Sequence, residues 1–118
     1  MKKYTKELSK KKCKPCEGGM PPLTREEAME LVKQIYEWEL KEENNILKIQ
    51  KTFKFRNFKE AIIFVNEVAE IAEEEKHHPN IEINYNRVKL ILWTHVIKGL
   101  SENDFIVAAK VDIVSYPL

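Results

Sequence analysis

The spacing of apolar residues along the chain changes between two periods. In residues 24–38 and 57–76 apolar positions recur every three to four residues, which predicts two helices. Residues 38–43, 46–55 and 81–85 alternate between apolar and polar, and a longer apolar run covers 87–96, which together predict four strands. Asn44-Asn45 suits the tight turn between the first two strands, because asparagine tolerates positive backbone angles.

Start signals mark the predicted helices. Thr24 and Glu27 form a capping box, in which a hydroxyl and a carboxylate satisfy free backbone donors. Asn57 can cap the second helix. Ser101 and Asp104 form a similar pair, which predicts a third helix over residues 101–115. The resulting order αββαββα predicts a two-layer α+β fold, with a four-stranded antiparallel sheet packed against helices.

The fourth predicted strand is apolar on both faces. One face carries Val88, Leu90, Leu92 and Val96, and the other carries Ile91 and Trp93 with His95. The predicted last helix adds a further apolar run, Phe105, Ile106, Val107 and Val111. We expect a homo-oligomer, because something must cover these surfaces.

Composition indicates one globular domain after a basic leader. The 118 residues are 43% apolar and 33% charged with only three glycines, which excludes collagen-like and disordered chains. The net charge of +1 hides a division: residues 1–19 hold seven lysines against Glu7 and Glu17, a balance of +5, so the rest sums to −4. We therefore interpret 1–19 as a basic flexible leader closed by Gly18-Gly19, and 20–118 as the domain.

The charge and hydropathy patterns also exclude classes of partner. No apolar run is long enough for a secretory signal or a membrane helix, so we expect a cytoplasmic protein without a membrane partner. The negative balance of the domain argues against nucleic-acid binding, which rewards clustered lysine and arginine.

Cys13 and Cys16 form a C-x-x-C pair in the leader. Two cysteines are too few for a disulfide scaffold, and no strand flanks them as a thioredoxin-like motif would require. They are solvated thiols or, as a weaker alternative, half of a zinc site completed by a second chain.

All three histidines fall between residues 77 and 95. His77 is expected in or just past the last turn of the second helix, which Pro79 stops, and close to three glutamates. The negative end of a helix and the glutamates both favour an imidazolium, so His77 is suited to donate a proton. Glu73 lies four residues earlier on the same helical face and can orient that ring or contact a ligand.

His95 comes from another strand, two residues after Trp93 on the same face. Trp93 could supply a flat apolar wall beside a ring-shaped substrate. The residues alone leave two alternatives open, surface histidines near a helix end and a metal site. No H-x-x-x-H or H-x-H pair supports zinc, and no G-x-S-x-G motif or glycine-rich phosphate loop is present.

A spaced motif in this region resembles the signature of the pterin-4a-carbinolamine dehydratases, also called dimerization cofactors of a homeodomain transcription factor. The motif is Glu73-x3-His77-His78-Pro79-x5-Tyr85-x9-His95-x8-Asp104. Thr94, Gly99-Leu100-Ser101, the earlier segment PPLTREEA and Trp38 are similar to the family as well. The resemblance covers the chain from about residue 21 and implies a hydro-lyase that converts 4a-hydroxytetrahydropterin to quinonoid dihydropterin without a metal or organic cofactor.

The resemblance also implies roles for single residues. His77 and His78 would be the acid–base pair, and His95 would bind or polarise the substrate near its hydroxyl. Asp104 could orient His95, and Glu73 could hold His77 or bind the amino-pyrimidine edge of the pterin. Three further candidates for substrate binding can equally be packing residues: Trp38, Tyr85 and Thr94.

The family resemblance leaves a second function open. Animal relatives bind a transcription factor, so this chain could be a protein-interaction module, a coactivator or dimerization cofactor, that retains the site. Relatives form dimers and tetramers, and we expect a tetramer in preference to a dimer. One position departs from the family, where Lys76 replaces a residue that is often acidic.

Overall fold

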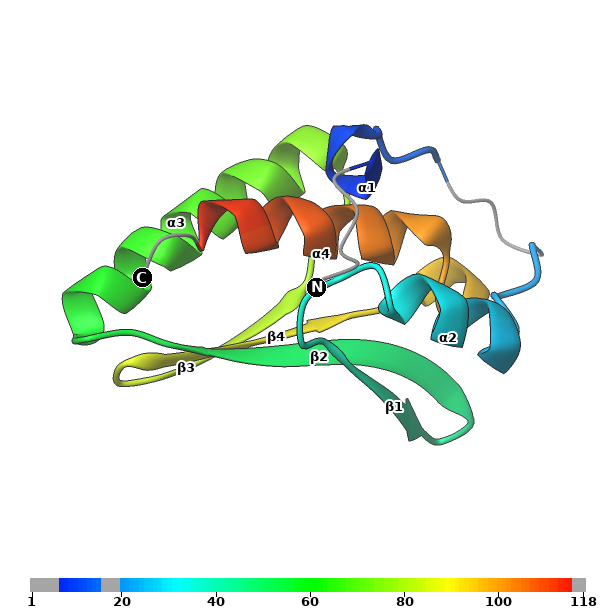
Figure 1. Ribbon diagram of the computed structural model, residues 1–118, viewed down its shortest axis with the longest axis horizontal. Coiled ribbons are helices and arrows are strands. Elements are labelled where there is room, and N and C mark those ends of the chain that lie inside the picture. Colours follow the sequence, from blue (N-terminus) through cyan, green and yellow to red (C-terminus); the bar gives the residue numbers. More distant parts are fainter. Residues whose placement is uncertain (1–6, 16–19, 116–118) are drawn as a thin grey trace.

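The computed structural model describes residues 7–15 and 20–115. Within them, a four-stranded antiparallel sheet of order β1-β2-β4-β3 carries the longer helices on one face, as Figure 1 shows. The elements are α1 Glu7–Lys10, α2 Arg25–Val32, β1 Glu39–Glu43, β2 Ile46–Lys54, α3 Phe58–Glu75, β3 Asn80–Asn84, β4 Arg87–Leu92, a 3₁₀ turn η1 His95–Ile97 and α4 Glu102–Val114. The predicted two-layer α+β fold is confirmed.

The pairing of β2 with β4 separates a core face from an open face. Ile49 lies opposite Leu92 and Phe53 opposite Val88, and these four side chains are buried under the helices. The alternate positions of β2 point away from the helical layer, as the period of two predicts. The turn before β2 contains Asn44 at φ 53° and Asn45 at φ 66°, the positive angles expected there.

The helix starts follow the predicted caps. Thr24 and Glu27 form the capping box of α2, and the side chain of Asn57 accepts from the Glu60 backbone N–H at the start of α3. The helix predicted over residues 24–38, which is α2, however, ends at Val32 rather than near Trp38. The chain turns through residues 33–37 instead, and the buried Trp38 donates its indole N–H to Asp112 of α4.

The fourth strand is shorter than predicted. It ends at Leu92, and His95 lies in η1 rather than on the strand. The Thr94 N–H donates to the Gly99 carbonyl at 2.7 Å, which folds this turn back on itself. A Cβ added to Gly99 would lie 2.5 Å from Cβ of Pro22, so only glycine permits this contact. Val96, expected on the core face, is exposed in consequence.

The apolar run of α4 has a different explanation from the one that the sequence suggested. Its side chains are buried within this chain, because α4 contacts α1, α2 and α3, with the sheet beneath them (Figure 1). The buried residues include Phe105, Ile106, Val107 and Val111. This run is therefore no reason to expect an oligomer, whereas Ile91 and Trp93 are only half-buried on the other face of β4.

The described part of the leader is packed on the domain. Leu8 of α1 is 2% exposed and joins the core beside α4. Residues 1–6 and 16–19, including Cys16 and Gly18-Gly19, lie outside the described residues. Among the described residues, no helix has the length and apolar content to cross a membrane.

Candidate functional site

The three histidines line one open cleft of about 610 Å³. Its walls come from the end of α3, the strand-to-turn segment before η1, the first turn of α4 and the leader. The lining residues are Cys13, Lys14, Pro15, Glu75, Lys76, His77, His78, Pro79, Asn80, Trp93, Thr94, His95, Val96 and Asn103. Residues from four distant parts of the sequence thus meet around the histidines.

The left-handed backbone conformation of Lys76 ends α3. The side chains of His77 and His78, which follow it, differ in their exposure. Lys76 has φ 56°, and the His77 N–H donates back to the Ala72 carbonyl at 3.1 Å. His77 therefore turns inward, with a side chain only 12% exposed, whereas the side chain of His78 is 59% exposed.

His77 is paired with Asp104. Its Nε2 lies 2.6 Å from Oδ1 of Asp104, whose side chain is fully buried in the first turn of α4. We expected Asp104 to orient His95, but the carboxylate contacts His77 instead. The reason is the end of β4, since His95 leaves the strand in η1, is exposed and stacks on Trp93.

The Asp104 carboxylate is held by two further donors. Oδ2 accepts from the Thr94 hydroxyl at 2.8 Å and from the Ser101 backbone N–H at 3.0 Å. Because Thr94 has one hydroxyl proton, the Ser101 hydroxyl 2.7 Å away must donate to Thr94. The capping box predicted for the last helix thus also fixes the carboxylate that faces His77.

This arrangement sets the tautomer of His77. A carboxylate only accepts, so Nε2 of His77 carries the proton that lies between it and Asp104. Nδ1 is then the ring nitrogen that can take up and release a proton.

Glu73 holds His78 rather than His77. Its Oε2 lies 2.6 Å from Nε2 of His78, and the side chains are 78% and 59% exposed. The turn at Lys76 carries His77 off the helical face on which the spacing of four had placed it. An exposed pair of this kind contributes little to stability, about 0–1 kcal/mol.

His95 and Trp93 form the other wall. Their rings stack with centroids 3.9 Å apart and planes 20° apart, and Nζ of Lys48 lies 4.8 Å from the Trp93 centroid. The indole N–H of Trp93 is buried and has no hydrogen-bond partner among the described residues. A buried donor without a partner favours a ligand acceptor beside it.

Two candidates from the sequence lie elsewhere. Trp38 is a core residue bonded to Asp112, and Tyr85, 63% exposed, lies in the turn between β3 and β4. Neither lines the cleft. Sequence reasoning missed Asn103 and Lys14, for which no local pattern gave a signal, because their contacts join positions far apart in the chain.

The cysteine pair gives no support for a metal site within the described residues. Burial, followed by the charge of Glu75, raises the pKa of the Cys13 thiol to about 12, so it is not a thiolate at neutral pH. Its Sγ lies 3.7 Å from the Asn103 carbonyl, and Cys16 is outside the described residues. No three histidine, cysteine or acidic side chains gather as metal ligands in 7–15 or 20–115.

The family profile described as "Pterin 4 alpha carbinolamine dehydratase" matches residues 21–114. The chain belongs to this family. A dehydratase-family protein of Rubrobacter xylanophilus, provisionally named a pterin-4-alpha-carbinolamine dehydratase, is 48% identical over 90% of this chain and 96% of its own length. One from Methylococcus capsulatus with the same provisional name is 50% identical over 89% of this chain and 90% of its own.

Two solved structures share the fold. A Brucella melitensis protein described as a transcriptional coactivator/pterin dehydratase is 32% identical, with a TM-score of 0.73 over 80% of this chain and 98% of that one. A pterin dehydratase-like protein identified as a RuBisCO assembly factor in the alpha-carboxysome is 23% identical, with a TM-score of 0.59 over 69% and 92%. The second likeness concerns the fold alone.

Proposed function

We propose that this protein is a 4a-hydroxytetrahydropterin dehydratase, a hydro-lyase of pterin recycling that acts in the cytoplasm. The observation that carries the proposal is the buried pair of His77 with Asp104 on a cleft that also holds His78 and His95. Membership of the dehydratase family supports it. In the proposed reaction the C4a–O bond breaks, N5 loses its proton, C4a=N5 forms and water leaves.

The pairing of His77 with Asp104 makes it the base in this proposal, whereas its place at the helix end had suggested a proton donor. Nδ1 takes the N5 proton, and the resulting imidazolium is stabilised by Asp104 through Nε2. His78 and His95 are the remaining candidates to protonate the leaving hydroxyl, and Trp93 beside His95 gives the flat pterin ring a surface to stack on. Exchange with solvent then restores both histidines.

Three alanine variants test the proposal. Dehydration of a synthetic 4a-carbinolamine should be followed for the wild type and for His77→Ala, His78→Ala and His95→Ala, with the uncatalysed rate subtracted. General acid–base catalysis contributes about 10²–10⁴-fold, so His77→Ala should lose most of the enhancement. A folded His77→Ala protein that dehydrates the substrate as fast as the wild type would disprove the role.

A protein-interaction role is the second candidate. It is supported by the Brucella melitensis structure, which is described as a coactivator as well as a dehydratase. We also propose a homo-oligomer, a tetramer in preference to a dimer, in which the half-buried Ile91 faces a partner copy. Light scattering measures the oligomer, and capture of a specific partner by a protein without turnover would favour the interaction role.

A further inference from the structure

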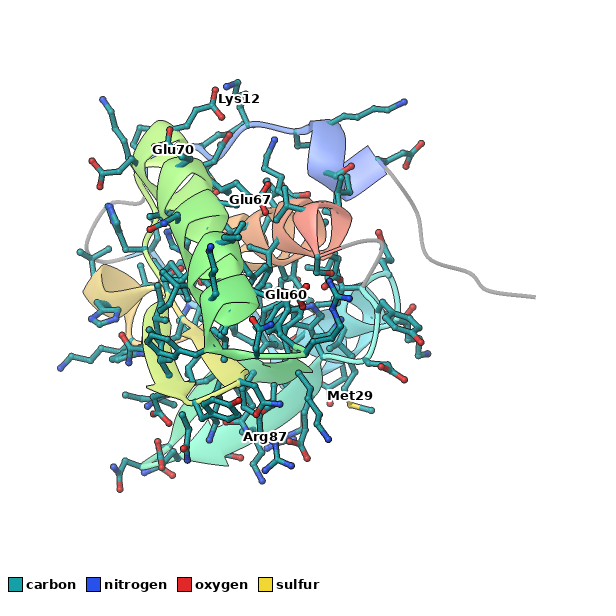
Figure 2. All side chains as sticks on the ribbon, turned by 90° about the vertical axis from the view of Figure 1, so that its left-hand side faces the viewer. Lys12, Met29, Glu60, Glu67, Glu70 and Arg87 are labelled. Carbon is teal, nitrogen blue, oxygen red and sulfur yellow. The ribbon has the colours of Figure 1, made fainter. Side chains whose placement is uncertain are left out.

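The described part of the leader forms one wall of the histidine cleft. Cys13, Lys14 and Pro15 line the cleft together with the three histidines, although their composition placed them outside the chemistry. Figure 2 shows Lys12, just before this segment, at the end of α3 that carries Glu70 and away from the end that carries Glu60. The leader therefore crosses the end of α3 from which His77 and His78 emerge.

A buried asparagine holds Lys14 by its backbone. Oδ1 of Asn103 accepts from the Lys14 N–H at 3.0 Å, and Nδ2 donates to the Lys14 carbonyl at 2.6 Å. Asn103 is 7% exposed, so a polar side chain of α4 is buried in order to pair with one residue of the leader. A buried amide left without these partners would cost free energy, which favours the docked leader.

A buried glutamate holds the preceding residue. Oε1 of Glu75 accepts from the Cys13 N–H at 2.8 Å, and Oε2 lies 3.5 Å from Nζ of Lys110 and 3.8 Å from Nζ of Lys12. Burial raises the pKa of Glu75, but the Cys13 N–H and the two lysines outweigh it and hold the pKa below its usual value. Lys110 also donates to the Ser9 carbonyl at 2.8 Å, next to the buried Leu8.

Both anchors adjoin residues of the proposed chemistry. Asn103 directly precedes Asp104, and Glu75 lies two residues before His77. We propose that the docked leader completes the pterin-binding cleft, and that Asn103 and Glu75 are positioning residues that seat it there. This inference rests on the proposed function for the identity of the ligand.

The comparisons agree with a leader that belongs to the domain. The match to the Rubrobacter xylanophilus protein covers 90% of this chain, more than the stretch from Pro21 onward can supply, so it extends into the leader. The family profile begins only at residue 21. The relative thus aligns with part of the leader, whereas the family profile does not include the leader.

The test separates docking of the leader from the chemistry. Leu8→Ala removes the apolar anchor, which does not line the cleft, and Asn103→Ala removes the polar one. Asn66→Ala, at an exposed position of α3, is the matched control. Hydrogen exchange of the backbone amides in 8–14 reports docking, and titration with oxidised biopterin, which has no 4a-hydroxyl to lose, reports binding.

We expect both anchor variants to exchange faster in residues 8–14 and to raise the Kd of biopterin about 10-fold, the effect of losing one good contact. Turnover of Leu8→Ala at saturating carbinolamine should stay within about 2-fold, because the histidines keep their partners. Asn66→Ala should change neither readout. Cooperative thermal unfolding checks that each variant is folded.

Two results would overturn the inference. One is a leader that exchanges freely while biopterin binds as in the wild type, and the other is a leader that stays protected in both anchor variants. A wild type that binds biopterin but does not dehydrate the carbinolamine would overturn only the proposed function. A wild type that binds no pterin would overturn both.

Discussion

Helix α4 carries two largely buried carboxylates that differ in their cationic partner. Asp104, in the first turn, accepts from His77, Thr94 and the Ser101 backbone. Asp112, two turns later, has an equally dense set of donors. They are Nζ of Lys51 at 3.0 Å, the Trp38 indole at 3.0 Å and the Tyr36 backbone at 3.3 Å.

The partner decides what each cluster can do. Lys51 also donates to the Tyr36 carbonyl at 2.7 Å and lies 4.7 Å from the centroid of Phe53. This cluster joins α4 to β2 and to the segment before β1, and none of its residues lines the cleft. His77 lines the cleft, so under the proposed function the same kind of buried carboxylate would support chemistry there, whereas Asp112 supports stability at the other end of α4.

The largest expected effect separates the two clusters by activity. Asp104→Asn keeps the shape of the side chain but removes the charge, and its amide can donate to Nε2 of His77, which moves the ring proton to Nδ1. The base is then blocked, and turnover should fall about 10²–10⁴-fold in a protein that still folds. Steady-state kinetics measure the loss, and nitrogen NMR of the histidine ring reports the tautomer. Normal turnover would mean that the pair is structural.

The converse change should cost stability without costing activity. Asp112→Asn leaves one acceptor oxygen where the carboxylate has two, so the Lys51 ammonium, the Trp38 indole or the Tyr36 N–H loses its acceptor. We expect the free energy of unfolding to fall by about 1–3 kcal/mol, the cost of a largely buried donor left without an acceptor. Urea unfolding measures it. A loss of turnover at a temperature where the variant is folded would contradict the division of roles.

The smallest effect is a pair of opposite pH dependences. The pKa of Glu75 is lowered, so its stabilisation is complete above pH 4.5 and is lost as the pH falls through its folded value. Burial raises the pKa of Asp112, despite Lys51, so stability falls as the pH rises from 3.8 through its folded value. Glu75→Gln should therefore flatten the acid loss of stability, and Asp112→Asn should steepen it.

Urea unfolding between pH 3 and pH 7 compares these slopes. The slope is the relevant quantity, because the substitutions also change stability by amounts that do not depend on pH. Equal slopes in the wild type and in Glu75→Gln would show that Glu75 does not titrate with the fold.

Local patterns in the sequence predicted the fold well. The change between periods located the strands and long helices, and the caps at Thr24, Asn57 and Ser101 located the helix starts, because each depends on neighbours within a few residues. The boundaries that failed depend on distant contacts. Trp38 is drawn to Asp112, and β4 is cut short where Gly99 meets Pro22.

The cluster of histidines was predictable, but their partners were not. A lysine with positive φ ends α3, and no sequence signal marks Lys76 as the residue that turns His77 toward α4 and leaves Glu73 to His78. The docking of the leader could not be predicted from the sequence for a similar reason. Its own composition is polar and basic, and the groups that hold it, Glu75 and Asn103, lie far along the chain.

The contact between Gly99 and Pro22 bears on the order in which the molecule assembles. The Leu23 N–H also donates to the Leu100 carbonyl at 2.9 Å, so the segment before α2 is hydrogen-bonded to the segment that follows η1. Closing so long a loop costs chain entropy that only the rest of the core can offset. We therefore expect the turn that carries His95 to form late in folding, and fragments from either half of the chain to lack a formed cleft.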